Sequence, residues 1–328
     1  MSGSPISGER RRAMLRTAMG PAIAAALADP RIIEVMVNPD GALRVDILGE
    51  GRVDTDVRID GAQVERIIRL VASHARGEVH AERPIVSAEL PPHGEGAGER
   101  FEGVLPPVSL APCFSIRKPA ARIYTLLDYV TDGIMSADAT RILSMAVVER
   151  RNILVVGGTS SGKTTLANAL LAEMARLDER VILIEDTREL QCAAPDVVAL
   201  RTRAGSVTMA DLVRSTLRLR PDRVIVGEVR GAEALDMLKA WNTGHPGGIA
   251  TVHANSALSA LYRVEQLVQE AVVSVPRPLI ADAIDLIVFI AGRGLARRIE
   301  TIARVVGLDP DGGYGLIDIT PTSQAQGV

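Results

Sequence analysis

Residues 157–164 read GGTSSGKT and match the phosphate-binding pattern GxxxxGK[ST] at every fixed position. The apolar run 152–156 before them is typical of a buried strand, and the residues from Lys163 to about Met174 are predicted to form a helix. In a strand, loop and helix of this order, backbone N–H groups and the positive end of the helix point at one anion. A glycine-rich turn can also arise by chance, but the motif and its context together predict a nucleotide site in an α/β fold.

The predicted ligand of this loop is ATP with Mg²⁺. Glycines allow the loop to curl around phosphate oxygens, the Lys163 ammonium group is expected to reach the β- and γ-phosphates, and the Thr164 hydroxyl is expected to bind Mg²⁺. Kinases, GTPases, DNA motors and assembly ATPases share such a loop, so the other strand ends must decide the function. The nucleotide-binding residues predicted here are Gly157, Gly158, Thr159, Ser160, Ser161, Gly162, Lys163, Thr164 and Thr165.

The second part of the chain, residues 125–328, is predicted to be an α/β unit with a parallel-rich sheet and a polar tail from about residue 320. Continuous Val, Ile and Leu runs separated by helical patterns are typical of parallel strands that helices cover on both faces. The predicted strands are residues 152–156, 181–185, 197–200, 224–227, 249–252 and 284–290.

The first part, residues 1–124, is predicted to be a smaller α+β domain. The runs 32–37 and 43–48 are predicted to form a hairpin, because the residues NPDG at 38–41 combine a proline that presets φ with a glycine that accepts positive φ. A helix is predicted after the hairpin, since apolar residues recur there with helical spacing at Val64, Ile67, Ile68, Val71 and Ala72.

The alanine-rich residues 18–28, which follow Arg10, Arg11 and Arg12, imitate a secretory signal peptide. The stretch is only weakly hydrophobic, and Arg16 interrupts the segment. In addition, a nucleotide site needs ATP, which is not available to secreted proteins. We therefore predict an amphipathic N-terminal helix in a cytoplasmic protein. No apolar run approaches the roughly 18 residues that cross a bilayer.

Acidic residues follow two of the predicted strands, at the sheet edge where open α/β proteins bind ligands. Glu228 follows residues 224–227, and its carboxylate is predicted to orient and polarise the attacking water, the alternative being a solvated residue at a strand end. Glu185 and Asp186 follow residues 181–184, and either can hold the water shell of Mg²⁺, with helix capping as the alternative for Asp186. The predicted metal ligands are thus Thr164, Glu185 and Glu228, the two acids through water.

His253 ends the predicted strand 249–252 and can donate to a γ-phosphate oxygen, although a satisfied core histidine is the alternative. The spacing of His253 and His245 fits no zinc pattern. The cysteines, Cys113 and Cys192, lie far apart and outside any C-x-x-C spacing, so neither a disulfide framework nor a zinc site is expected.

The charge balance argues against nucleic acid as the direct ligand. The 328 residues include 37 Lys and Arg against 40 Asp and Glu, a formal net charge of −3, and only 2% of the residues are aromatic. Such a chain lacks the positive field and the stacking platforms of non-specific nucleic-acid binders. A DNA motor stays open as an alternative only because local arginines such as Arg201, Arg203 and Arg214 can line a pore.

Four sequence blocks together resemble the Walker A, Asp-box, Walker B and His-box motifs of the secretion-traffic ATPases, which drive type II and type IV secretion and pilus assembly. The blocks are GGTSSGKTTL from Gly157, VILIEDTREL from Val181, RPDRVIVGEVRGAEA from Arg220 and TGHPGGIATVHANSA from Thr243. Residues 34–41 and 100–107 resemble the N-terminal domain of the conjugal-transfer members, the TrbB type. The resemblance extends from about residue 32 to 306, and the chain lacks the four-cysteine insertion of type II secretion members.

This resemblance implies a homohexameric ring of two-domain subunits, with ATP and Mg²⁺ in a cleft between the N-terminal domain and a RecA-like C-terminal domain. It implies that Glu228 is the catalytic Walker B glutamate, Glu185 the Asp-box acid and His253 the His-box residue, beside Lys163. Arg100 and Arg117 match N-terminal arginines that reach the nucleotide phosphates, in cis or across a subunit boundary. Without the resemblance, a surface ion pair is the alternative for each arginine.

The implied function is Mg-dependent ATP hydrolysis that powers a type IV secretion or conjugal-transfer machine. The implied location is the cytoplasm, at the periphery of the inner membrane, and the implied partners are further copies of the chain and inner-membrane components of the machine. The alternatives are a nucleotide-gated assembly scaffold with incidental turnover and a motor like that of type IV pili.

Overall fold

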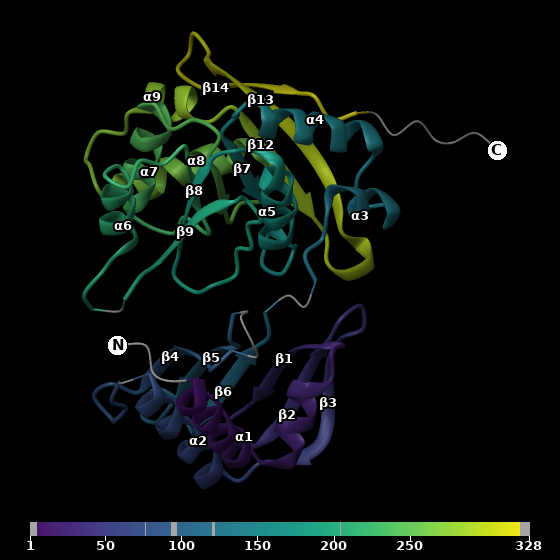
Figure 1. Ribbon diagram of the computed structural model, residues 1–328, viewed down its shortest axis with the longest axis vertical. Helices are drawn as coiled ribbons and strands as arrows, with labels where there is room; N and C mark the ends of the chain where they lie inside the picture. The colour runs from purple at the N-terminus through teal and green to yellow at the C-terminus, as the bar shows by residue number, and fades with distance from the viewer. Residues whose placement is uncertain (1–4, 76, 93–96, 120–121, 204, 322–328) are drawn as a thin grey trace, which may run out of the picture. The chain divides into compact units, whose positions relative to one another are not determined.

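The computed structural model describes residues 5–75, 77–92, 97–119, 122–203 and 205–321, without the side chains of residues 5–12 and 295. The chain forms two compact units, residues 1–121 and 122–328 (Figure 1), whereas the sequence suggested a boundary after residue 124. Residues 322–328, most of the predicted polar tail, lie outside the described residues.

The first unit contains an antiparallel sheet, to which its described residues contribute six strands in the order β3-β2-β1-β6-β5-β4. The predicted hairpin of β1 and β2 is confirmed, and Gly41 in its turn has a φ of 76°, a conformation that favours glycine. The strands are β1 (Ile32–Val37), β2 (Ala42–Ile47), β3 (Gly51–Arg58), β4 (Ile85–Glu89), β5 (Arg100–Val104) and β6 (Cys113–Arg117).

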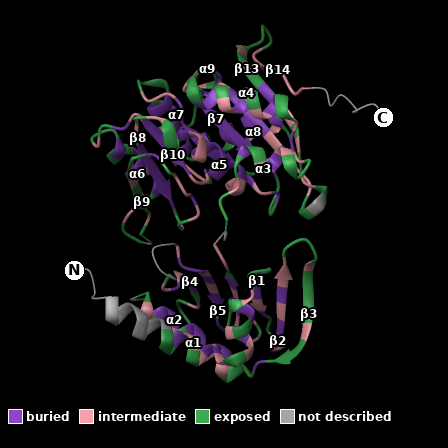
Figure 2. Cartoon of the chain, turned by 45° about the vertical axis from the view of Figure 1, so that its right-hand side comes forward, coloured by how far each residue is buried: buried purple, intermediate pink, exposed green. Residues whose placement is uncertain are grey.

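Two helices, α1 (Pro5–Ala28) and α2 (Gly61–His74), pack on one face of this sheet (Figures 1 and 2). The carboxylate of Asp60 begins α2 by accepting a hydrogen bond from the backbone N–H of Ala62 at 3.1 Å. All five apolar residues that predicted this helix are buried: Val64, Ile67, Ile68, Val71 and Ala72.

The N-terminal helix α1 is broken at Gly20, whose φ is 80°, and Pro21 begins its second segment. Proline has no N–H to give to the preceding turn, so the break falls where the sequence places the Gly-Pro pair. The buried side chains recur at about four-residue spacing, as predicted for an amphipathic helix: Leu15, Met19, Ile23 and Leu27. Among the described residues, no helix has both the length and the apolar character that a membrane crossing needs.

The second unit is built on one sheet, with the strand order β14-β13-β12-β7-β11-β10-β8-β9 in the described residues. The strands from β12 to β9 run parallel, and β13 and β14 add an antiparallel edge. The strands are β7 (Ile153–Val156), β8 (Arg180–Glu185), β9 (Asp196–Arg201), β10 (Arg223–Val226), β11 (Ile249–Val252), β12 (Leu286–Ala291), β13 (Arg298–Leu308) and β14 (Tyr314–Asp318).

All six predicted strands of this unit are present, but β13 and β14 were not predicted. Exposed and more buried residues alternate along β13, and charged side chains interrupt its apolar residues. A search for continuous apolar runs finds strands that are covered on both faces, and it misses an edge hairpin of this kind.

Helices cover both faces of the second sheet, and its central strands β7, β11, β10 and β8 are buried between them (Figure 2). Ile153 and Val155 of β7 point to one helical layer, and Leu154 and Val156 point to the other. The first layer is α3 (Leu126–Thr131), α4 (Ala137–Val148), α5 (Lys163–Ala172) and the short helix η1 (Glu173–Arg176). The second layer is α6 (Met209–Thr216), α7 (Glu233–Asn242), α8 (Ala257–Gln269) and α9 (Arg277–Ala283).

The carboxyl ends of four neighbouring strands, β7, β11, β10 and β8, lie at the same edge of this parallel sheet. The loop 157–164 follows β7, His253 follows β11, Glu228 follows β10 by two residues, and Glu185 ends β8. The topology therefore brings together predicted site residues that lie as many as 96 positions apart in the sequence.

Candidate nucleotide-binding site

The P-loop, residues 157–164, joins β7 to α5 in a tightly packed turn. Gly162 precedes the helix with a φ of 98°, which favours glycine. A Cβ atom on Gly157 would lie 2.4 Å from the Ser161 Oγ atom and 2.5 Å from the Ile290 carbonyl oxygen, so only glycine fits there. Because the first N–H groups of a helix have no partners within that helix, the loop and α5 present donors to an anion.

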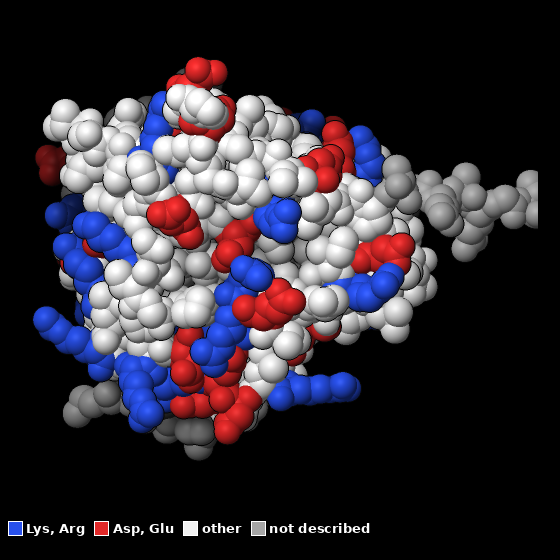
Figure 3. Space-filling view, turned by 90° about the horizontal axis from the view of Figure 1, so that it is seen from above, with Lys and Arg blue, Asp and Glu red and all other residues white. Residues whose placement is uncertain are grey.

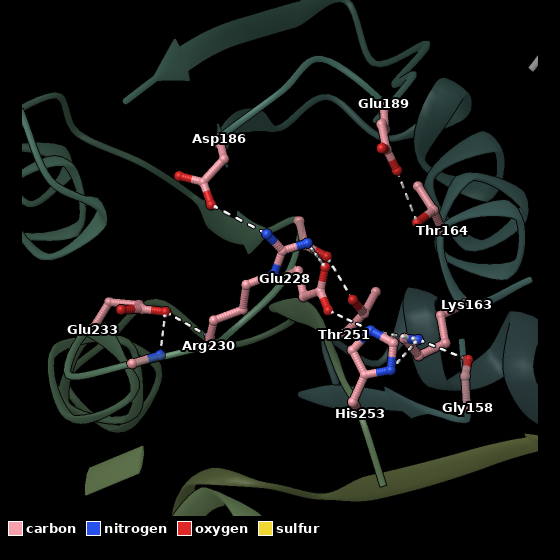
Figure 4. Close-up of polar contacts among 12 residues, drawn as sticks. Gly158, Lys163, Thr164, Asp186, Glu189, Glu228, Arg230, Glu233, Thr251 and His253 are labelled. Carbon is pink, nitrogen blue, oxygen red and sulfur yellow. Dashed lines mark hydrogen bonds and ion pairs between the residues drawn. The ribbon is translucent and has the colours of Figure 1, made fainter. Parts of the chain in front are cut away.

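Lys163 is the buried cation of this loop, with 7% of the residue exposed. Its Nζ atom donates to the Gly158 carbonyl oxygen at 3.0 Å and lies 3.2 and 3.3 Å from the Nδ1 and Nε2 atoms of His253 (Figure 4). A carbonyl oxygen and a ring nitrogen bind an ammonium group less strongly than anionic oxygens do. Lys163 is therefore placed to exchange these contacts for phosphate oxygens.

Glu228 lies between a histidine and an arginine (Figure 4). Its Oε1 atom is 2.7 Å from the Nε2 atom of His253, and its Oε2 atom accepts a hydrogen bond from Arg230. Burial acts to raise the pKa of Glu228, but the hydrogen bond and charge of Arg230, together with His253 and Lys163, outweigh burial and hold the pKa below its ordinary value. Glu228 is therefore a carboxylate near neutral pH.

The pKa of His253 is lowered, first by partial burial of the ring and then by the charge of Lys163, although Glu228 acts in the opposite direction. The imidazole is therefore neutral at pH 7, with one ring nitrogen protonated and the other able to accept. Such a ring can accept a hydrogen bond from Lys163 and donate another to an oxygen atom.

Glu185 turns its carboxylate into the loop that follows β8. The residue is 4% exposed, and its Oε1 atom accepts hydrogen bonds from the backbone N–H groups of Glu189 at 2.9 Å and Leu190 at 2.7 Å. Burial raises the pKa of Glu185 to about 7, although the two N–H donors act to lower it. In this structure Glu185 holds the shape of the loop at 186–190.

Glu189 is the acid beside the predicted magnesium-binding hydroxyl, and the sequence analysis did not single it out. Its Oε2 atom accepts a hydrogen bond from the Thr164 hydroxyl at 3.2 Å, and its backbone carbonyl oxygen accepts one from the Asn168 side chain at 2.9 Å. The available signal was a third acid, four residues after Glu185, in the block VILIEDTREL. Only the path of the loop brings that acid back to α5.

Arg230 and Glu233 lie on the segment that follows Glu228, and neither residue was predicted to belong to the site. The Oε1 atom of Glu233 accepts hydrogen bonds from the backbone N–H groups of Arg230 at 2.7 Å and Gly231 at 2.9 Å, which fixes the segment after Glu228. Asp186 lies 3.9 Å from the Arg230 guanidinium group and accepts a hydrogen bond from the Thr202 hydroxyl, and it caps no helix. The sequence signal was the close run of charges in GEVRGAEA.

The residues present fit a nucleotide with Mg²⁺. The Ser161 Oγ atom is buried without a hydrogen-bond partner in the described part of the chain, inside the turn that a Cβ atom on Gly157 would fill. Thr164 and Glu189 offer a hydroxyl and a carboxylate, the oxygen donors that Mg²⁺ takes together with waters and phosphates. Across the described residues, no group of three or more His, Cys, Asp or Glu could hold a metal alone, so phosphates and waters would supply the other ligands.

The predicted arginines Arg100 and Arg117 lie side by side in the first unit. Arg100 begins β5, Arg117 ends β6, and the two are direct cross-strand partners. Each arginine also has a glutamate as its other cross-strand partner, Glu89 opposite Arg100 and Glu34 opposite Arg117. This arginine pair forms a group of its own, while the other predicted site residues lie in the second unit.

The model of one protein family, described as type II/IV secretion system protein, matches residues 22–307. The chain is 47% identical over 295 residues to the conjugal transfer protein TrbB of Rhizobium radiobacter, covering 89% of this chain and 90% of that protein. It is 32% identical over 286 residues to the type IV secretion system protein VirB11 of Bartonella henselae, covering 75% and 78% of the two chains.

Among solved structures, the pilus retraction motor PilT with bound ADP matches with a TM-score of 0.60 at 20% identity, covering 92% of this chain and 83% of that one. At this identity the likeness bears on the fold alone. It confirms the predicted fold class, a RecA-like P-loop unit with a parallel-rich sheet after a smaller α+β unit.

Proposed function

This chain belongs to the type II/IV secretion system protein family, and from that membership we propose that it hydrolyses ATP with Mg²⁺ to power a conjugal-transfer or type IV secretion machine. The resemblance read from the four sequence blocks is confirmed, and the chain is an ATPase of the secretion type. The alternative of a motor for a type IV pilus is less favoured, because the conjugal transfer protein is similar over nearly the whole chain.

The observation that carries the proposal is the set of groups at one sheet edge. A neutral histidine lies within hydrogen-bonding reach of both a buried lysine in the P-loop and a charged glutamate, and the three residues follow three neighbouring parallel strands. Phosphoryl transfer asks little covalent chemistry of the protein, and it depends on positioning and on charge stabilisation. These groups supply both.

Nucleotide binding begins at the P-loop. The N–H groups of the loop and of the first turn of α5 donate to phosphate oxygens, and the Lys163 ammonium group moves from the Gly158 carbonyl oxygen to the terminal phosphates. The predicted residues from Gly157 to Thr165 form this cradle. A cation that is already buried needs little reorganisation to stabilise the charge that develops during transfer.

Thr164 and Glu189 are the residues that would hold Mg²⁺, with Glu185 shaping the loop that carries Glu189. Mg²⁺ held by these residues would neutralise charge on the phosphates. The hydrogen bond between the Thr164 hydroxyl and the Glu189 carboxylate holds these two oxygen donors together beside the N-terminus of α5.

Glu228 is the residue that orients and polarises the attacking water. Its lowered pKa keeps it charged and able to accept a hydrogen bond from that water. His253 donates a hydrogen bond to a γ-phosphate oxygen, and it loses this partner when the phosphate leaves. Arg230, held by Glu233 through the backbone, keeps the carboxylate in place.

Arg100 and Arg117 supply further positive charge to the phosphates when the nucleotide is bound. Their cross-strand pairing gives two guanidinium groups at one end of a rigid ladder. We place this chain in a homohexameric ring, in which the first unit of a subunit serves its own nucleotide or that of a neighbour. Closing and opening of the first unit with each turnover would transmit force.

The ring works in the cytoplasm, where ATP is available, against the inner-membrane components of the secretion machine. Nucleic acid is not the direct ligand in this proposal. On the face drawn in Figure 3, basic and acidic side chains are interspersed rather than gathered by sign, which is consistent with the near-neutral charge of the chain.

The test is steady-state ATPase activity of Lys163→Ala, with Lys239→Ala, an exposed lysine in α7, as the matched control. We expect Lys163→Ala to lose activity by about a hundredfold or more, because the buried charge at the phosphates is gone. Lys239→Ala should keep the wild-type rate. Equal rates in the two variants would refute the site, and an ATPase rate unchanged by secretion-machine membranes would favour the scaffold alternative.

A further inference from the structure

The side chain of Arg297 lies against the P-loop, although Arg297 lies outside every sequence motif of the site. A Cβ atom on Gly162 would lie 3.0 Å from both the Cζ and the Nε atoms of Arg297, and 3.3 Å from its Nη1 atom. The guanidinium group therefore packs directly on the backbone of the residue that begins α5. Gly162 accommodates this approach as well as its positive φ.

The turn between β12 and β13 places Arg297 there. β12 is the parallel neighbour of β7, with Phe289 opposite Val156, so its carboxyl end lies next to the P-loop. The turn is tight, because Gly292 has a φ of 77° and a Cβ atom there would lie 2.0 Å from the Ala296 carbonyl oxygen. The backbone N–H of Arg297 donates to the Gly294 carbonyl oxygen at 3.3 Å. The position of Arg297 thus follows from the sheet.

The charge of Arg297 is not balanced by an acid in the described part of the chain, where no ion pair or side-chain hydrogen bond involves it. Its Nε atom is buried without a hydrogen-bond partner among the described residues, and so is the Ser161 Oγ atom of the P-loop. A helix N-terminus carries partial positive charge, so a guanidinium group placed on it, near Lys163, is unfavourable on its own. An anion at the loop would satisfy the Nε donor and remove the repulsion.

We propose that Arg297 is a further nucleotide-binding residue, which contacts the phosphate chain from the same subunit that supplies the P-loop. This inference rests on the proposed function, since the anion is the phosphate chain of its nucleotide. Because Arg297 packs on Gly162, at the start of the helix that binds the inner phosphates, the contact is made to ADP as well as to ATP. Arg297 then holds product and substrate alike.

The experiment measures the affinity of Mg·ADP by calorimetry for wild type, Lys163→Ala, Arg297→Met, Arg297→Lys and Arg293→Met. Methionine keeps an apolar stem and removes the charge, lysine keeps a charge, and Arg293 is an exposed arginine of the same turn. We expect Arg297→Met to weaken ADP binding by about tenfold or more, as for a lost charge-assisted hydrogen bond. Arg297→Lys should recover part of the loss, and Arg293→Met should bind as wild type does.

The thermal midpoint of each variant without nucleotide separates binding from packing. We expect the midpoint of Arg297→Met to stay within about 2 °C of wild type, because no described partner of the guanidinium group is lost. ADP affinity equal to that of Arg293→Met, a lysine variant as weak as the methionine variant, or a loss matched by a fall in the midpoint would each overturn the inference. If wild type binds ADP and Lys163→Ala does not, such a failure concerns Arg297 alone. If wild type binds no ADP, the proposed function and this inference fail together.

Discussion

Strands β8 and β10 share one sequence pattern, but the glutamates at their carboxyl ends differ in the direction of their pKa shifts. Each is a buried apolar strand that leads to a glutamate at the carboxyl edge of the parallel sheet, Glu185 in one case and Glu228 in the other. Both carboxyl groups are largely buried. Burial alone would raise the pKa of each.

The partners of the two carboxylates make the difference. Glu185 accepts two backbone N–H bonds, which do not offset burial, and its pKa is raised to about 7. Glu228 faces Arg230, His253 and Lys163, which do offset burial, and its pKa is lowered. The hydrogen bond and charge of Arg230 therefore separate the two acids, because they keep Glu228 ionised although it is largely buried.

The largest expected effect is that of Glu228→Gln on turnover. Glutamine keeps the size of the side chain but cannot polarise the attacking water, so we expect the rate to fall by about a hundredfold or more. Binding of ATP should persist, since the P-loop is intact. Undiminished hydrolysis in Glu228→Gln would remove this residue from the mechanism.

Glu185→Gln is expected to act on stability and not on chemistry. The raised pKa of Glu185 means that the folded state favours its protonated form, so the contribution of this group to stability is full below about pH 4.5 and is lost as the pH rises through 7. Glutamine mimics the protonated acid, and the variant should gain over wild type with rising pH, by at most about 3 kcal/mol.

Urea unfolding of both proteins between pH 4.5 and 8 measures this difference. A stability gap that does not change with pH would show that the surroundings of Glu185 do not hold it protonated. Turnover in Glu185→Gln should stay within about threefold of wild type, because in this structure the side chain binds backbone and not the reacting groups.

Glu189→Gln is expected to change the Mg²⁺ dependence of the ATPase activity. The Glu189 carboxylate lies against the Thr164 hydroxyl, so its loss should raise the Mg²⁺ concentration for half-maximal activity by about tenfold. Asp178→Asn, at an exposed acid in the loop before β8, is the matched control. If both variants show the wild-type Mg²⁺ dependence, Glu189 does not hold the metal.

The smallest expected effect is a shift in the pH profile of Arg230→Met. Removing the guanidinium group removes the main influence that opposes burial at Glu228, so the pKa of Glu228 should rise. The acid limb of kcat/KM should then move to higher pH. An acid limb in the wild-type position would mean that Arg230 does not tune this carboxylate.

The parts of the site that are local in sequence could be predicted, and the parts made by returning loops could not. The P-loop, its strand and its helix form one continuous segment, and Glu228 and His253 follow recognisable strands. Strand ends meet at one edge of a parallel sheet, so their proximity follows from the fold class.

Glu189 and Arg297 show what this reasoning misses. Each reaches the P-loop only because a loop or a turn doubles back, and neither carries a motif of its own. Glu185 stays a predicted metal ligand from its strand-end position, which resembles that of Glu228, and in this structure its carboxylate accepts hydrogen bonds from the backbone of Glu189 and Leu190. The partners that separate the two acids are contributed by other loops, which a strand pattern does not describe.

Calorimetric titration of the wild-type chain with a non-hydrolysable ATP analogue at millimolar Mg²⁺ tests whether this sheet edge is a nucleotide site. We expect saturable binding of one nucleotide per chain, which Lys163→Ala abolishes and Glu228→Gln retains. Absence of saturable uptake by the wild-type chain, or unchanged uptake by Lys163→Ala, would contradict the account.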